Sequence, residues 1–258
     1  MRFFKSIFNA LSLLVLLAGC DQQAMLEKFI PKEESAIAKQ VLSQLATKNY
    51  ADVEKQLDPS IRNASARAAL EQMAALFPPA EPKSVTTVGA NTHTASDVTT
   101  YNLTFEHEFS NLWLLTNVVL QRRDAQVTIL GLHVKPMKQS LKELNRFTFE
   151  GKGIRHYLVF ALAITVPLFI VFSLILCFKT PVENRKWLWL LFIALGFVQL
   201  SLNWTDGSYG VQLISFVLLG AGIFSAGPYA PTVISIAFPL GAVIFLFKRR
   251  SLMVGNTA

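Results

Sequence analysis

Two hydrophobic patterns divide the chain. Between Asp21 and His156 apolar residues alternate with polar and charged ones, whereas long apolar runs between Tyr157 and Phe247 contain only five charged side chains. A helix of about 20 apolar residues is long enough to cross a bilayer. The predicted divisions are a soluble domain at 33–138, a connector at 139–156, a membrane domain at 157–247 and a tail at 248–258.

Between Asp21 and His156 the spacing of apolar residues changes once, from a helical to an alternating pattern. Helical spacing of apolar residues predicts three amphipathic helices, and Pro78-Pro79 ends the third of them. Alternation after Pro82 then predicts three or four strands joined by short turns. The strongest strand pattern lies in SDVTTYNLTFEHEF, where Tyr101, Leu103 and Phe105 alternate with polar residues. Helices followed by an antiparallel sheet predict an α+β domain with the helices on one face of a curled sheet.

The apolar half predicts an all-α transmembrane bundle. Under this prediction Lys179, Arg185 and Lys186 lie in the cytoplasm, because cations are retained there during insertion. The cationic tail at 248–250 conflicts with four crossings, so either the tail is translocated or one of the last two segments does not cross fully. Length favours four crossings. The predicted spans are 157–178, 187–203, 209–226 and 231–247.

The positive charge is concentrated around apolar segments. The net charge is +7, yet the part from Asp21 to His156 has 16 basic and 15 acidic residues. The remaining cations flank apolar runs and are typical of topology signals rather than of a nucleic-acid-binding surface. The basic connector at 139–156 fits either contact with anionic headgroups or a solvated helix face.

The N-terminus has the features of an export signal. Arg2 and Lys5 precede an apolar run, which ends in Leu17-Ala18-Gly19-Cys20. This ending resembles the lipobox of bacterial lipoproteins. The resemblance implies removal of a signal peptide at 1–19, palmitate-containing lipid on Cys20 and a tether at 20–32. It also implies that Asp21 retains the protein in the inner membrane, with the soluble domain on the periplasmic or external side. The alternative is an uncleaved signal anchor.

The soluble domain has a second resemblance. Its element order, with NYADVEKQLDP as the second helix, is similar to the cystatin-like cone of the nuclear-transport-factor superfamily. That resemblance implies a scaffold with a pocket between sheet and helices. It implies no particular activity, because function depends on the site rather than on the fold.

His107 is the candidate around which a site could form. It shares one strand face with Tyr101, Leu103 and Phe105, and Trp113 follows on the next strand. A catalytic interpretation would add His133 on a neighbouring strand and a carboxylate partner from Asp97, Glu106 or Glu108. Glu106 and Glu108 flank His107, so strand alternation directs them to the opposite face. The predicted ligand-pocket residues are Tyr101, Leu103, Phe105, His107 and Trp113.

These patterns favour a non-catalytic role. The sequence has no nucleophile elbow, phosphate-binding loop or paired zinc cysteines, so it predicts no cofactor and no metal. We expect an accessory or assembly protein that binds a ligand or another envelope protein, with membrane lipids as partners and no nucleic acid. The alternative is an envelope enzyme using His107. A transport component ranks third, because the apolar segments have few ionisable groups.

Overall fold

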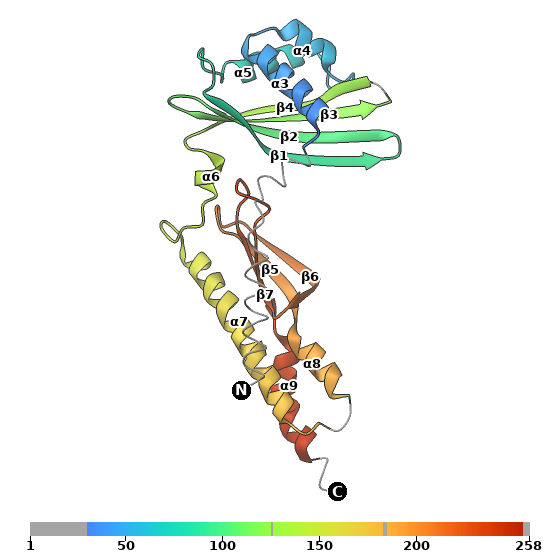
Figure 1. Ribbon diagram of the computed structural model, residues 1–258, viewed down its shortest axis with the longest axis vertical. Helices are drawn as coiled ribbons and strands as arrows, with labels where there is room; N and C mark the ends of the chain where they lie inside the picture. Colours follow the sequence, from blue (N-terminus) through green and yellow to red (C-terminus); the bar gives the residue numbers. More distant parts are fainter. Residues whose placement is uncertain (1–29, 125, 183–184, 255–258) are drawn as a thin grey trace. The chain divides into compact units, whose positions relative to one another are not determined.

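The computed structural model describes residues 30–124, 126–182 and 185–254, with side chains described up to Arg249. The chain divides into two compact units, and each is described by itself (Figure 1). The first unit holds the described residues up to Glu143 together with Gly227–Tyr229. The second holds Leu144–Ala226 and the described residues from Ala230 onward. Cys20 and Asp21 lie outside the described residues, so their roles stay predictions.

The first unit consists of helices followed by an antiparallel sheet. All neighbouring strands in the order β1-β2-β3-β4 pair antiparallel. The helices pack on one face of this sheet (Figure 1). The elements are α3 (Lys32–Ala46), α4 (Tyr50–Gln56), α5 (Ala66–Ala74), β1 (Ser84–Ala95), β2 (Val98–Glu108), β3 (Trp113–Arg123), β4 (Gln126–Met137) and the short α6 (Leu141–Leu144). This order of helices and strands agrees with the order expected from the sequence.

Alternation along the strands builds the core of this unit. Leu103 and Phe105 on β2 are completely buried, and so is Leu114 on β3. They pack against the apolar face of α3, which contributes Leu42 and Leu45. Each large apolar side chain buried in this way contributes about 1.5–3 kcal/mol. A shift of one residue in the register would turn the buried stripe to solvent, so this pattern also specifies the strand pairing.

The second unit combines helices with a second antiparallel sheet. The sheet has the order β6-β5-β8-β7. Helix α7 packs against β8 and β7, while α8 and α9 pack against each other and α7. The elements are α7 (Ile154–Lys179), α8 (Lys186–Ala194), β5 (Leu195–Asn203), β6 (Tyr209–Leu218), β7 (Ala221–Phe224), β8 (Val233–Phe238) and α9 (Leu240–Val254).

The prediction of an all-α membrane bundle is therefore wrong. Among the described residues only α7 is long and apolar enough to cross a membrane as a helix. The segment predicted as a span at 187–203 is α8 followed by β5, and the one at 209–226 is β6 followed by β7. The segment at 231–247 contains β8 and the first part of α9.

Each of these three apolar segments changes its backbone conformation part-way along. Leu219 and Gly220 have φ angles of 58° and 67° and form the turn between β6 and β7. Pro239 separates β8 from α9, as expected for a residue that lacks a backbone donor. Apolar length alone does not distinguish a buried strand from a helix, and this ambiguity caused the error.

Glycine permits the close approach of α9 to α8. A Cβ atom added at Gly241 would lie 1.9 Å from the carbonyl oxygen of Phe192, so no side chain fits there without a shift of the backbone. Ala242 and Phe245, on the same helix, are completely buried in the cluster formed with Ile193. Helix packing at this point therefore requires glycine.

We expect Gly241→Ala to lower the thermal unfolding temperature of the purified full-length protein. Forcing apart two packed segments costs about 1–3 kcal/mol. Gly222→Ala on β7 is the matched control, because no atom lies within 4 Å of a Cβ added there. Equal unfolding temperatures for the two variants would contradict the packing described here.

Candidate ligand-binding site

A cavity of about 470 Å³ opens in the first unit beside the end of β2. Helix α3 provides one wall with Lys39, Leu42 and Ser43. The chain from Phe77 to Pro82 provides the opposite wall, and His107 belongs to the lining. The cavity therefore joins three segments that are far apart in the sequence.

The local sequence explains why space is left at this place. α5 ends at Ala74, and the prolines at 78, 79 and 82 prevent the chain from continuing as a helix or pairing as a strand before β1. Leu42 belongs to the buried face of α3, whereas Lys39 and Ser43 lie at the edge of that face and are exposed. The result is an apolar hollow with polar groups at its rim.

His107 is held rigidly in the lining of this cavity. Its Nε2 atom forms a 2.9 Å hydrogen bond with the hydroxyl of Thr116, and its ring makes an edge contact with Phe77 at 6.0 Å between centroids. Burial lowers the pKa of His107 to about 4, and the nearby charge of Lys39 acts in the same direction. The imidazole is therefore neutral at pH 7 and presents a hydrogen-bonding group without a charge.

No catalytic partner lies beside His107 in the described part of the chain. Thr116 is completely buried, so its hydroxyl cannot reach a bound substrate. Glu106 lies on the other face of β2, where its carboxylate accepts a hydrogen bond from the backbone N–H of Leu141. Burial raises the pKa of Glu106, and the hydrogen bond from Leu141 opposes this shift. His133 on β4 is exposed, and its strand partner is Asn117.

Of the five residues predicted to line a pocket, His107 lines this cavity and the other four do not. Leu103 and Phe105 are buried core residues beneath α3. Trp113 is paired with Glu108 at the start of β3, on the opposite strand face from buried Leu114. The sequence alternation located the inward stripe of the sheet, but α3 covers most of that stripe.

Tyr101 belongs to an ion-pair cluster. Burial and a hydrogen bond to the Glu34 carboxylate raise the pKa of its phenol. Arg122 on β3 lies 2.9 Å from a carboxylate oxygen of Glu34 and 3.0 Å from one of Glu33, measured from Nη2. These contacts fasten the first turn of α3 to β2 and β3. They therefore position the helix that forms one wall of the cavity.

Sequence reasoning missed Lys39 and the wall from Phe77 to Pro82. The available signal was the proline cluster, which was interpreted only as the end of a helix. Lys39 could not be assigned, because a polar residue at the border of an amphipathic helix is usually solvated. Only the packing of α3 over the sheet brings Lys39 beside His107.

Comparison with known proteins adds no assignment to this site. No family model, curated protein or solved structure matches the chain. Within the described ranges no group of three or more His, Cys, Asp or Glu side chains could hold a metal ion. The chemistry of the cavity is therefore considered from its own residues.

The burial of neutral His107 predicts a pH-dependent stability. Its pKa is about 4 in the folded state, against 6.5 for a free imidazole, so the unfolded state binds more protons as the pH falls. The free energy of unfolding should thus decrease between pH 6.5 and 4, by up to about 3 kcal/mol from this residue. Well above pH 6.5 the residue is neutral in both states and contributes no pH dependence.

Urea unfolding of the full-length protein, followed by Trp fluorescence at several pH values, measures this effect. His107→Gln should unfold with a weaker pH dependence over that window than the wild type. His133→Gln replaces an exposed histidine and should behave as the wild type. If both variants keep the full pH dependence, His107 is not the group that titrates.

Proposed function

We propose that this chain is a bacterial inner-membrane protein whose first unit binds a small, mainly apolar ligand with an anionic or hydrogen-bonding group. The observation that carries the proposal is the cavity at the end of β2. Its volume of about 470 Å³ falls within the usual range for small-molecule sites, and apolar walls with a few polar groups are typical of such sites.

The polar groups of the cavity suggest the chemistry of the ligand. Leu42, Phe77 and Phe109 provide apolar walls, which would contact a hydrocarbon or aromatic body. Lys39 and Glu81 are the charged residues of the lining, and neutral His107 offers a hydrogen bond deeper in the unit. An amphiphile with a carboxylate, sulfonate or phosphate group would place its apolar body against the apolar walls and its anionic group near Lys39 and His107. This arrangement favours binding over catalysis.

The second unit supports attachment to a membrane. α7 has 26 residues and would be about 39 Å long, enough to cross the hydrocarbon core. Leu168 and Phe172 on α7 are more than half exposed, and Ile214 on β6 is 91% exposed. Apolar surface of this extent is typical of contact with lipid or with another protein.

The two ends of the second unit are marked by different polar contacts. At one end, the ammonium group of Lys152 donates to the carbonyl of Trp204 at 2.6 Å, and Phe147 stacks on the Trp204 ring. At the other end, Arg249 donates to the hydroxyl of Thr180 at 3.2 Å. The cationic tail and the cations that follow α7 therefore share one end of the unit. In our proposal this end faces the cytoplasm, as cations prefer.

The turn at Leu219–Gly220 explains how the tail reaches that end. β6 runs away from the Trp204 end, and β7 returns after the turn, so these two strands together make no net crossing.

Insertion of the second unit in a membrane requires partners for the edges of its sheet. Open sheet edges are not stable in hydrocarbon, because their backbone N–H and C=O groups lack partners. The exposed edge strand β6 must then be covered by another strand.

A test of the binding site uses naphthalene sulfonate, a small anionic aromatic compound, and calorimetry of the full-length protein in nanodiscs. Lys39→Gln should weaken binding by about two- to fivefold, the loss expected for one exposed charge contact. Lys32→Gln, in the first turn of the same helix, is the control. Ala46→Trp should abolish binding, because Ala46 lines the cavity. Unchanged binding in Ala46→Trp would place the compound elsewhere.

A test of the topology uses a reporter that is active only in the cytoplasm. Fused after Ala258, it should be active, because Arg249 and Thr180 lie together at the cationic end. The same reporter inserted after Asp206, in the turn between β5 and β6, should be inactive. The reverse result would overturn the proposed orientation.

A further inference from the structure

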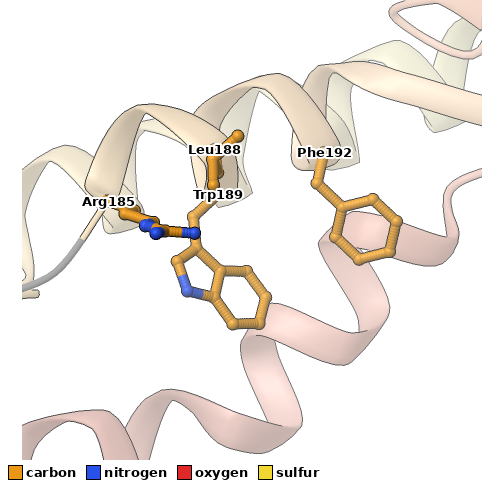
Figure 2. Close-up of a pocket in the computed structure, with 4 residues that line it drawn as sticks. All are labelled: Arg185, Leu188, Trp189 and Phe192. Atoms are coloured by element: carbon orange, nitrogen blue, oxygen red, sulfur yellow. The ribbon is translucent and has the colours of Figure 1, made fainter.

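A second cavity, of about 370 Å³, lies on helix α8 at the cationic end of the second unit. It is lined by Arg185, Leu188, Trp189 and Phe192. Leu188, Trp189 and Phe192 lie on α8 at helical spacing, and Arg185 is the residue directly before the helix, with a φ angle of 54°. Figure 2 shows the Arg185 guanidinium beside the Trp189 indole, with Phe192 further along the same face. The cavity therefore has a charged end and an aromatic wall.

Neighbouring aromatic rings hold the apolar wall in place. The ring of Trp189 lies 5.8 Å from that of Phe245 on α9 and 6.3 Å from that of Phe192, measured between centroids. Phe192 in turn makes an edge contact with Phe197 on β5 at 5.5 Å. Packing against two other elements keeps these rings from folding into the cavity.

Cations surround the charged end. The Lys186 ammonium donates to the carbonyl of Phe178 at 2.7 Å, which places it at the end of α7. Arg249 joins the same end through Thr180. The two sequence segments concerned, 179–186 and 248–250, contain six basic residues and one acidic residue, Glu183. The potential at this end is therefore positive.

We propose that this cavity binds an anionic phospholipid. Its phosphate group pairs with Arg185, and an acyl chain lies along Leu188, Trp189 and Phe192. Charge complementarity favours an anionic over a zwitterionic lipid, and basic pockets at a cytoplasmic membrane surface have this specificity. A soluble anion would use the guanidinium but leave the aromatic wall uncovered. The inference rests on the proposed insertion of the second unit in a membrane.

Quenching of Trp189 by brominated lipids tests the proposal. The protein carries Trp187→Phe to remove the adjacent exposed indole and is placed in nanodiscs of phosphatidylcholine with a minority of phosphatidylglycerol. Bromine is introduced on the acyl chains of one lipid or the other at equal amounts. We expect brominated phosphatidylglycerol to quench more strongly, with an enrichment of about fivefold near Trp189, the factor expected for one Arg–headgroup contact.

Arg185→Gln in this background should make the two brominated lipids equally effective. Arg155→Gln replaces an exposed cation in the first turn of α7 and should leave the preference unchanged. Trp189→Phe should remove the lipid-specific part of the signal. Equal quenching by both lipids before any change at Arg185 would overturn the lipid site. No quenching by either lipid would instead overturn the membrane insertion on which it rests.

Discussion

The second unit has more apolar side chains than its own fold can bury, and this constraint shapes the rest of the structure. Along α7 only Val159, Ile170, Ser173 and Cys177 are buried, although the helix is apolar over almost its whole length. Apolar surface left in water is unfavourable in proportion to its area. The unit therefore needs lipid or protein along α7 and β6. Most of its cations lie in two sequence segments, 179–186 and 248–250, which flank apolar elements.

The first unit, in contrast, buries its apolar side chains within its own fold. Its helices and sheet bury a continuous core, and the cavity lined by His107 lies where prolines interrupt the chain. At this border His107 is a buried polar group, and such a group must be hydrogen-bonded to be tolerated. Thr116 meets that need from the adjacent strand. The resulting neutral imidazole suits recognition of a ligand more than proton transfer at neutral pH, because its pKa lies well below 7.

Some of this organisation could be predicted from individual residues. The alternation of Leu103, Phe105 and His107 indicated an inward strand face, and Pro78-Pro79 indicated the end of a helix. The partner of that face could not be predicted in the same way. Whether α3 covers Phe105 and leaves His107 beside a cavity depends on where the helix crosses the sheet. Contacts between distant segments, such as Arg122 with Glu34, determine that crossing.

The sequence by itself determined which side chains avoid water, where the cations lie relative to the apolar runs, and that helices precede an antiparallel sheet in the first unit. Only the tertiary structure decided that the apolar runs after α7 form strands as well as helices. The physical reason is that a run of apolar residues has no period that separates the two conformations. A helix completes its hydrogen bonds within its own segment, whereas β5 needs β6 and β8 beside it, and only folding brings those strands together.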